Sequence, residues 1–462
     1  MSSTQSPDQP ITRSRDGDSK PRRALNPTSP LTASVRQKHQ EFMLPATIQY
    51  YKDTPVLTEG KGLRIRDADG NEYLDFFGGI LTVSVGHANE RVNAAVRAQI
   101  DRLSHISSLY PSLPVVELAE RLARLAPGNL KQTCFTASGT EADETAVMLA
   151  ELFTGSTEFV ALRHGYSGRS TLAQSMTGVS GWRALPTMVP GVKHAVSPYC
   201  YRCPLKLTYP SCGIACAKDI DELIRTTTTG RVAAFIAEPI QGVGGFITPP
   251  PEYFEIAVSI IRKFGGVFIC DEVQTGFGRT GGTMWGIEHW GVQPDIMTAA
   301  KGIANGLPLG MTIATPEIAA SLKALTISTF GGNPVSTAAA NATIQIIEEE
   351  DLPGNAARMG ALLRAGLEDL RARFPHSIGD VRGMGLMQGV ELVADEMAGD
   401  RTPDAAMTNR VFEEARQRGL LIGKGGLYGN CFRIAPALNV AASDVHEAIE
   451  ILRESFAAAG AR

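Results

Sequence analysis

Lys301 and Asp271 are the residues whose types and spacing most directly suggest chemistry. Asp271 ends the apolar run 267–270, and Lys301 follows a short strand pattern over residues 295–300. A charge at the end of a buried strand is costly unless it is compensated, because burial removes its hydration. An amine and a carboxylate at adjacent strand ends would suit a cofactor between them. The amine would form a Schiff base and the carboxylate would keep a ring nitrogen protonated, which predicts bound pyridoxal 5′-phosphate.

A second interpretation of this pair stays open at this point. Two charged strand ends that face a cleft are a common structural feature, and a buried Lys301–Asp271 ion pair would have the same spacing. The choice between an ion pair and a cofactor site therefore depends on the rest of the chain.

The elements that must position the two residues follow from the hydrophobic pattern. Between residues 90 and 345, apolar strand patterns alternate with helical patterns, which is typical of an α/β protein with a mostly parallel sheet covered on both faces. Helices are predicted over 140–153 and 253–264, and strands over 159–162, 232–237 and 311–314.

The composition changes along the chain predict four parts. Residues 1–40 are rich in Ser, Thr, Pro and charge, which predicts a disordered tail. Residues 41–90 are expected to join a small domain, and residues 91–345 to form the large cofactor-binding domain. Residues 346–462, with a long helix at 356–374 and short strands, are expected to form the smaller α+β domain.

The overall composition narrows the class of protein. A length of 462 residues exceeds one ordinary core, so two or three folding units are expected. Hydrophobic residues make up 43% and charged residues 20%, as in soluble globular proteins. The net charge of −4 gives no electrostatic reason to expect nucleic acid or acidic lipid as a partner. No apolar run approaches the length of a membrane-spanning helix, so no membrane contact is predicted.

The predicted tail bears on the compartment. It contains several arginines, which raises the question of an organelle transit peptide. Asp8, Asp16 and Asp18 argue against such a peptide, because transit peptides are poor in acidic residues. We therefore expect a cytoplasmic enzyme.

Four of the seven cysteines, Cys200, Cys203, Cys212 and Cys216, fall close together in the sequence. A C-x2-C pair followed by a C-x3-C pair is compatible with a tetrahedral zinc site. The alternative is a surface excursion that keeps small, partly buried thiols, and we favour it because no other pattern demands a metal. The prediction is therefore no metal, and no disulfide in a reducing compartment.

Several separate motifs then resemble one family. They are TASGTEA at 136–142, EPIQG at 238–242, DEVQTGFGR at 271–279, AAKG at 299–302 and STFGGNP at 328–334. Their order and spacing resemble class III aminotransferases from about residue 49 to residue 452. The segments GDVRGMGLM at 379–387, GLLIG at 419–423 and FRIAP at 432–436 are most similar to the alanine–glyoxylate type. The resemblance implies the pyridoxal-phosphate fold type I, like that of aspartate aminotransferase.

The phosphate and ring of the cofactor are assigned by this resemblance. The turn at Ser138, Gly139 and Thr140 opens a helix, where backbone N–H groups and the helix dipole favour an anion, and the family's equivalent turn binds the phosphate. Ser138 and Glu141 also fit a capping box, which is the purely structural interpretation. The resemblance implies that Tyr166 stacks on the pyridine ring, although a buried structural tyrosine would otherwise be preferred.

Three further cofactor residues are implied in the same way. Gln274 matches the residue that reaches the phenolic oxygen of pyridoxal phosphate, and Glu238 opens the motif at 238–242. Thr329 matches a threonine that crosses a dimer interface to the phosphate of the neighbouring site. The resemblance therefore implies a homodimer with shared active sites, while a tetramer stays possible.

Substrate binding is assigned to two arginines. Arg433 matches the family's arginine motif, and its guanidinium can bind a carboxylate with two parallel hydrogen bonds. A surface ion pair is the alternative for a lone arginine. Relatives specific for ornithine or 4-aminobutyrate carry a glutamate at the position of Val243 that masks this arginine. Arg169 matches a carboxylate-binding arginine of relatives that use ornithine, acetylornithine or 4-aminobutyrate, which keeps ω-amino acids open as donors.

The expected reaction is a transamination in which Lys301 moves a proton and Asp271 keeps the ring nitrogen protonated. The donor is expected to be alanine or an ω-amino acid such as β-alanine or 3-aminoisobutyrate, and the acceptor glyoxylate or pyruvate. The alternatives are a 4-aminobutyrate or ornithine-type enzyme using 2-oxoglutarate, and an aminomutase of the same fold. A dehydrogenase is disfavoured because no G-x-G-x-x-G follows the first strand. Retention of Lys301, Asp271 and Arg433 argues against a non-catalytic binding protein.

Overall fold

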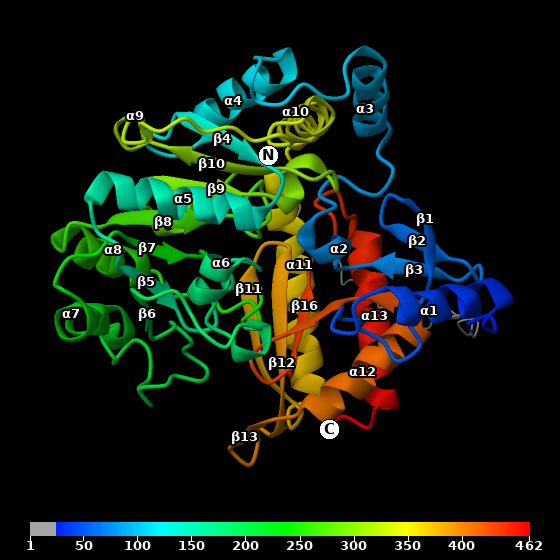
Figure 1. The fold of residues 1–462 in the computed structure, drawn as a ribbon. Coiled ribbons are helices and arrows are strands. Elements are labelled where there is room, and N and C mark those ends of the chain that lie inside the picture. The colour runs from blue at the N-terminus through cyan, green and yellow to red at the C-terminus, as the bar shows by residue number, and fades with distance from the viewer. Residues whose placement is uncertain (1–24) are drawn as a thin grey trace, which may run out of the picture.

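The computed structural model describes residues 25–462, and residues 1–24 of the predicted tail lie outside the described part. A seven-stranded sheet forms the centre of the larger half of the molecule (Figure 1). In chain order its strands are β4 (Gln132–Thr136), β5 (Phe159–Leu162), β6 (Val192–Ala195), β7 (Ala234–Ala237), β8 (Val267–Asp271), β9 (Ile296–Ala299) and β10 (Gly310–Ala314).

The order of strands in this sheet is β4-β10-β9-β8-β7-β5-β6. The neighbours from β9 to β6 pair in parallel, whereas β10 runs antiparallel to both β4 and β9. The predicted α/β class with a mostly parallel sheet is therefore confirmed. The pairing of β8 with β9 also confirms that the two strands expected to carry Asp271 and Lys301 are neighbours.

Helices cover both faces of this sheet. They are α5 (Gly139–Thr154), α6 (Thr171–Met176), α7 (Ala215–Thr227) and α8 (Tyr253–Lys263). Residues 159 and 161 of β5 join the hydrophobic cluster of α5, whereas residues 160 and 162 join the cluster that contains α7 and α8. This alternation arises because successive side chains of a strand point to opposite faces, and both faces are buried here.

Four further helices lie around the β4–β10 edge of the sheet (Figure 1). They are α3 (Glu90–Arg102), α4 (Leu113–Leu125), α9 (Pro316–Ala319) and α10 (Pro334–Glu349). Helix α10 packs against both α3 and α4. Its side chains Ala339, Ala340, Ile344 and Ile347 are fully buried, so this helix belongs to the main core.

The C-terminal part contains a second, antiparallel sheet. Its strands are β11 (Ile378–Met384), β12 (Met387–Asp395), β13 (Asp400–Pro403), β15 (Gly423–Gly425) and β16 (Cys431–Ile434). The helices beside it are α11 (Leu352–Arg373), α12 (Ala405–Gln417) and α13 (Ala442–Ala458). Helix α13 packs against both α11 and α12.

A third sheet joins the two ends of the described chain. The order is β1 (Leu57–Lys61), β2 (Arg64–Asp67), β3 (Glu72–Asp75) and β14 (Leu420–Leu421). Strand β3 pairs antiparallel with β2 on one side and parallel with β14 on the other, so its second strand partner comes from residues near 420. The domain boundaries at residues 90 and 345 stay a prediction.

The structure corrects one part of the predicted tail. Residues 30–40 were expected to be disordered, but they belong to the helix α1 (Pro30–Phe42). Ser29 caps this helix by accepting a hydrogen bond from Thr32 N, and Thr32 Oγ1 donates to Asp69 Oδ1 at 2.7 Å. The helix is anchored by a residue outside the predicted tail, which is why the local composition did not reveal it.

Helix α11 approaches the turn between β11 and β12 so closely that only a glycine fits. A Cβ atom added to Gly360 would lie 2.4 Å from the backbone of Gly385, far inside van der Waals contact. Gly385 itself has a φ of 50°, a left-handed conformation that favours glycine.

Gly360→Ala is therefore expected to lower the free energy of unfolding by about 1–3 kcal/mol, because the backbone must separate from the helix. Equilibrium urea unfolding followed by circular dichroism measures this change. Gly181→Ala is the matched control, since a Cβ there meets no atom within 4 Å. Equal stability of the two variants would contradict the proposed close packing.

Candidate active site

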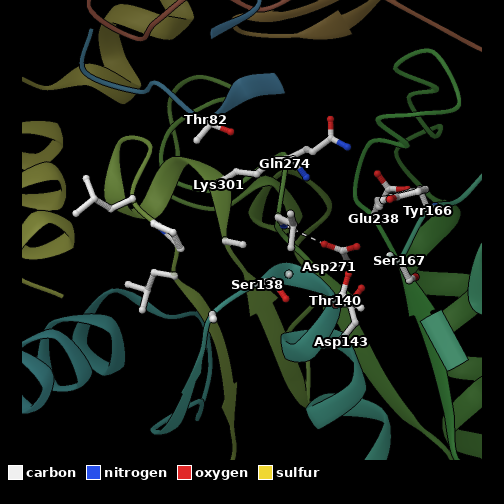
Figure 2. Close-up of a pocket in the computed structure, with 18 of the residues that line it drawn as sticks. Thr82, Ser138, Thr140, Asp143, Tyr166, Ser167, Glu238, Asp271, Gln274 and Lys301 are labelled. Carbon is white, nitrogen blue, oxygen red and sulfur yellow. Dashed lines mark hydrogen bonds between the residues drawn. The ribbon is translucent and has the colours of Figure 1, made fainter. Parts of the chain in front are cut away.

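Lys301 and Asp271 line one cavity of about 330 Å³ at the carboxyl ends of β8 and β9 (Figure 2). Asp271 is the last residue of β8, and Lys301 begins a short 3₁₀ turn (Lys301–Ala304) just after β9. Lys301 has a φ of 43°, which is unusual for a residue with a side chain. Such backbone conformations persist where the surrounding structure enforces them, often at functional sites. The predicted proximity of the two residues is confirmed.

Burial disfavours the charged forms of both residues. It lowers the pKa of the Lys301 amine, although the nearby Asp271 and Glu238 carboxylates oppose that shift. Burial also raises the pKa of Asp271 to about 6. A hydrogen bond from Val273 N, at 2.9 Å, and the charge of Lys301 keep the pKa of Asp271 from rising further. The neutral lysine is thus more accessible than in water, which suits a group that must accept a proton.

Two more buried carboxyl groups lie in the same cavity. Burial and the Asp271 charge raise the pKa of Glu238 to about 8, even though Gly242 N donates to Glu238 at 2.7 Å. Burial and Asp271 likewise raise the pKa of Asp143, which accepts a hydrogen bond from Thr298 Oγ1 at 2.7 Å. Three carboxyl groups therefore surround one lysine. A protonated ring nitrogen beside Asp271 would supply positive charge there, so these residues fit the predicted cofactor.

The predicted anion site lies at the start of α5. Gly139 and Thr140 both line the cavity, and the first N–H groups of a helix have no acceptor within the helix. A Cβ at Gly168 would lie 2.3 Å from Thr140 Oγ1, so the neighbouring loop approaches this helix start closely. Backbone donors, the helix dipole and a Thr hydroxyl at one end of the cavity suit a phosphate group.

The capping interpretation of this helix is confirmed in part. Ser138 Oγ accepts a hydrogen bond from Glu141 N at 3.3 Å, as a capping residue does. The Glu141 carboxylate accepts from Ala137 N at 2.9 Å instead of from the backbone of Ser138. Capping and anion binding use different groups of this turn, so both functions are compatible.

Tyr166 and Gln274, the two residues predicted to contact the cofactor ring, also line the cavity. Tyr166 is in a T-shaped edge contact with Trp182, with ring centroids 5.7 Å apart, and its backbone N donates to Glu238 Oε1 at 3.1 Å. Gln274 is 7% exposed, and its Oε1 has no hydrogen-bond partner among residues 25–462. A buried amide atom without a partner is costly, and a ligand that bonds to this side chain would remove that cost.

Arg433 lies beside this cavity, on β16, rather than in its wall. The side chain is buried, with the residue 4% exposed. Its hydrogen bonds go to uncharged groups: Nη2 donates to Tyr50 Oη at 3.1 Å, Nη1 to Gly242 O at 3.4 Å and Nε to Lys424 O at 3.3 Å. Within the described part of the chain it forms no ion pair, so the surface ion-pair interpretation does not apply. A buried cation with no carboxylate partner favours binding of an anion.

The structure does not bring Arg169 or Thr329 into the wall of the cavity. Arg169 is exposed at its rim, where its backbone N donates to Thr140 Oγ1 at 3.4 Å. Thr329 is exposed and lies in the segment between β10 and α10. The roles predicted for these two residues depend on a substrate and on a second chain, and they stay predictions.

Sequence reasoning missed some residues of the cavity wall. Asp143, Thr82, Ser167 and the segment 306–309 line it in addition to the predicted residues. Asp143 follows Thr140 by three positions on α5, and residues three apart share one face of a helix. That spacing is a signal that would have identified it. Thr82 has no such local signal, because its approach depends on how distant parts of the chain pack.

The four clustered cysteines surround a separate, small cavity. None of them forms a disulfide. No set of three or more His, Cys, Asp or Glu residues in the described part of the chain is arranged to hold a metal ion. Burial, together with the neighbouring thiols, raises the pKa of Cys216 to about 11, which favours the neutral thiol.

Comparison with known proteins places these features in a family. The family description "Aminotransferase class-III" matches residues 49–456. The mitochondrial alanine–glyoxylate aminotransferase 2 homolog 2 of Arabidopsis thaliana is 43% identical over 430 residues, which covers 93% of this chain and 88% of that protein. The human mitochondrial alanine–glyoxylate aminotransferase 2 is 37% identical over 442 residues, covering 91% of this chain and 86% of that protein.

A solved structure gives the same result for the fold. The pyridoxal-phosphate-bound amine transaminase from an uncultivated Pseudomonas species superposes with a TM-score of 0.85 at 34% sequence identity. The match covers 91% of this chain and 99% of that one. Because both the family description and these relatives extend along most of its length, this protein belongs to the class III aminotransferases, enzymes that use pyridoxal 5′-phosphate to transfer amino groups.

Proposed function

We propose that this aminotransferase moves an amino group from alanine, or from an ω-amino acid such as β-alanine or 3-aminoisobutyrate, to glyoxylate or pyruvate. The observation that carries the proposal is the buried Arg433 with no carboxylate partner in residues 25–462. Val243, at the position where other relatives have a masking glutamate, cannot neutralise it. The α-carboxylate of alanine, pyruvate or glyoxylate would then bind Arg433 with two parallel hydrogen bonds.

The residues of the cavity divide the work of the reaction. Bound pyridoxal phosphate supplies an electron-accepting ring that stabilises negative charge at the substrate Cα. Lys301 Nζ would remove the proton from the donor's Cα and, in the reverse half-reaction, deliver a proton to the Cα of the keto acid that accepts the amino group. Its lowered pKa favours the neutral amine that can accept a proton. Asp271 holds the ring nitrogen in its protonated form, with Asp143 and Thr298 behind it.

The other predicted residues bind the cofactor and orient the substrate. Gly139 and Thr140, at the start of α5 after the capping Ser138, hold the phosphate. Tyr166 and Gln274 line the cavity, where Tyr166 would cover the ring and limit access of water and Gln274 would bond to the phenolic oxygen. Arg433 orients the substrate so that its Cα faces Lys301.

Arg169 favours a second candidate. Its exposed position at the rim would let it bind the distal carboxylate of a longer donor, as in a 4-aminobutyrate or ornithine-type enzyme that uses 2-oxoglutarate. An aminomutase of the same fold ranks below both. A mutase would turn over without a separate keto acid, and that requirement separates it from a transaminase.

We also propose a homodimer with shared sites, with a tetramer as a further possibility. Support comes from the surface around Thr329, where Leu325, Ile327 and Phe330 are all exposed. Leu109 and Tyr110 are exposed as well, and the neighbouring Ser108 bonds to Ser328. A large apolar surface of this kind is typical of a protein interface.

The compartment is proposed from the sequence alone. Acidic residues in the N-terminal segment favour the cytoplasm over an organelle. The two alanine–glyoxylate relatives are described as mitochondrial, so fractionation of cells that contain the full chain is the direct test. Among residues 25–462, no helix is both long and apolar enough to cross a bilayer.

Lys301→Ala is expected to lower the transamination rate by at least about a thousandfold, because the group that moves the proton is lost. The visible absorbance of the lysine-bound cofactor should also vanish, while circular dichroism stays as in the unchanged protein. A control at Lys263, which pairs with Asp221 on the surface, should keep both signals when changed to Ala. Turnover near the normal rate in Lys301→Ala would refute the assignment.

Mixing two inactive variants tests the shared site. If Thr329 serves the neighbouring chain, a heterodimer of Thr329→Ala and Lys301→Ala has one site with both lesions and one site with neither. Random exchange at limiting cofactor should then restore about one quarter of the normal sites. Proven subunit exchange without recovered activity would mean that Thr329 acts within its own chain or not at all.

Substrate choice is tested by a donor panel with two variants. Alanine, β-alanine, 4-aminobutyrate, ornithine and 3-aminoisobutyrate are measured against pyruvate, glyoxylate and 2-oxoglutarate. Val243→Glu should raise the KM for alanine and pyruvate most, because a buried Glu–Arg433 pair would compete with the α-carboxylate. Arg169→Ala should impair ω-amino acids and spare alanine. Equal losses for both substrate classes in both variants would refute this division between the arginines.

A further inference from the structure

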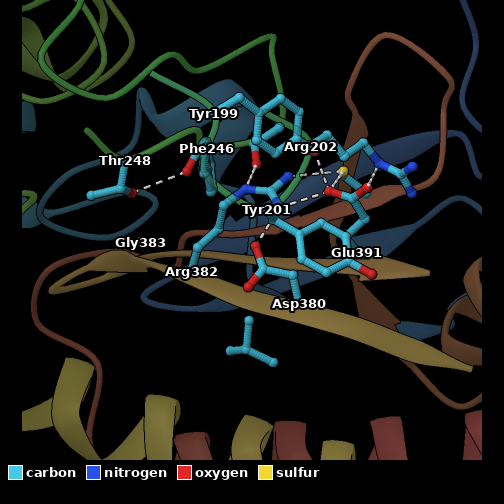
Figure 3. Close-up of polar contacts among 12 residues, drawn as sticks. Tyr199, Tyr201, Arg202, Phe246, Thr248, Asp380, Arg382, Gly383 and Glu391 are labelled. Atoms are coloured by element: carbon cyan, nitrogen blue, oxygen red, sulfur yellow. Dashed lines mark hydrogen bonds and ion pairs between the residues drawn. The ribbon is translucent and has the colours of Figure 1, made fainter. Parts of the chain in front are cut away.

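A buried group of charged residues lies behind Arg433, outside the cavity of Figure 2. We name it the Arg382 cluster, and Figure 3 shows most of its members. Arg382 lies on β11 and Glu391 on the adjacent β12, and the two residues are 8% and 0% exposed. The complete cluster consists of Tyr199, Arg202, Asp380, Arg382, Glu391 and Cys431.

Arg382 uses all three of its guanidinium nitrogens. Nη1 donates to Asp380 Oδ2 at 2.8 Å and to Glu391 Oε2 at 2.7 Å, and Nη2 donates to Cys431 Sγ at 3.1 Å. The remaining nitrogen, Nε, donates to the backbone oxygen of Gly245 at 2.8 Å. One rigid, planar side chain therefore joins three strands of the second sheet, β11, β12 and β16, to a loop of the first.

The cluster holds this arginine in a single orientation. Glu391 also accepts hydrogen bonds from Tyr199 Oη and Arg202 Nε, and the Tyr199 ring lies 4.8 Å from the Arg382 guanidinium. Burial alone would raise the pKa of Glu391, but these partners lower it, so the carboxylate stays charged. Because Asp380, Glu391, Cys431 and Gly245 would each lose a hydrogen bond if Arg382 moved, this buried network resists movement of its side chain.

The loop that Arg382 contacts, residues 242–246, lies between the Arg382 cluster and Arg433. On one side of the loop, Gly245 O accepts from Arg382. On the other side, Gly242 O accepts from Arg433 Nη1 at 3.4 Å, and the Phe246 ring lies 5.9 Å from the Arg433 guanidinium. A hydrogen bond of 3.2 Å from Gly245 N to Gly242 O joins the residue that contacts Arg382 to the residue that contacts Arg433.

The loop fits against the cluster without spare room. Gly245 has a φ of 95°, and a Cβ there would lie 2.9 Å from Cys431 Sγ and 3.1 Å from Arg382 Nη2. The other side of the loop is packed even more closely, since a Cβ at Gly242 would lie 2.2 Å from Gln274 Nε2. A shift of Arg382 therefore displaces the loop, and the loop carries an acceptor of Arg433.

We propose that Arg382 is a positioning residue for the substrate-carboxylate site. It fixes the loop 242–246 through Gly245 O, and the loop in turn fixes the direction of the Arg433 guanidinium. This inference rests on the proposed role of Arg433. Lysine cannot replace Arg382, because one ammonium group cannot reach Gly245, Cys431 and two carboxylates at once.

The test compares three variants of the cofactor-loaded enzyme. Arg382→Lys keeps the buried charge but loses the fork of donors. Gly245→Ala keeps both charges and displaces the loop directly, so it gives an answer even if Arg382→Lys does not fold. Arg364→Lys is the matched control, because Arg364 also bonds to the backbone of β11, at Val381 and Gly383, but forms no hydrogen bond to the loop 242–246 in the described part of the chain.

In both Arg382→Lys and Gly245→Ala, the KM for alanine and pyruvate should rise about tenfold through misplacement of Arg433. The kcat at saturation and the bound cofactor per chain, measured by absorbance, should stay within about twofold of normal. Arg364→Lys should leave the KM unchanged. A normal KM in Gly245→Ala, or a loss of kcat and cofactor together with KM in Arg382→Lys, would overturn the positioning role. Failure of the unchanged enzyme with every α-carboxylate donor would instead refute the proposed function.

Discussion

The loss of water around charged groups at the ends of β8 and β9 is the constraint on which the site depends. It lowers the pKa of Lys301 and raises those of Asp271 and Glu238, because burial disfavours the charged form of each group. A cofactor that bonds to the Lys301 amine and brings a protonated nitrogen to Asp271 would remove the cost of burying these two charged groups. Cofactor binding should therefore stabilise the folded chain, because the gain exists only where these groups are brought together.

The sequence predicts the proximity of Asp271 and Lys301 because the position of each residue depends on one short strand. Asp271 and Lys301 each end a short strand, and parallel neighbouring strands bring their carboxyl ends to one edge of the sheet. The helix start at Ser138 is likewise readable from one short segment. The α/β class follows from the same alternation of elements. The family resemblance adds what spacing cannot, namely the assignment of Tyr166, Gln274 and Arg433.

The remaining features depend on contacts between distant segments. Helix α1 is held by a hydrogen bond to Asp69, which lies outside the predicted tail. The composition of the tail alone therefore predicts disorder there. The hydrogen bond from Arg382 to Gly245 joins residues 137 positions apart, and no local sequence pattern predicts it. The burial of Arg433 without an ion pair among the described residues is of the same kind. Asp143 differs, because its spacing of three residues from Thr140 on α5 is visible in the sequence and places both on one face of the helix.

The parallel pairing of β3 with β14 has a consequence for synthesis of the chain. Asp75 must wait for Leu421, its partner in the register, which is 346 residues later (421 − 75). At roughly 5–20 residues per second, that wait lasts on the order of tens of seconds. The strands from β4 to β10 are complete by residue 314, well before Arg433 is made. The nascent chain can therefore assemble the strands around Lys301 before Arg433 has been synthesised.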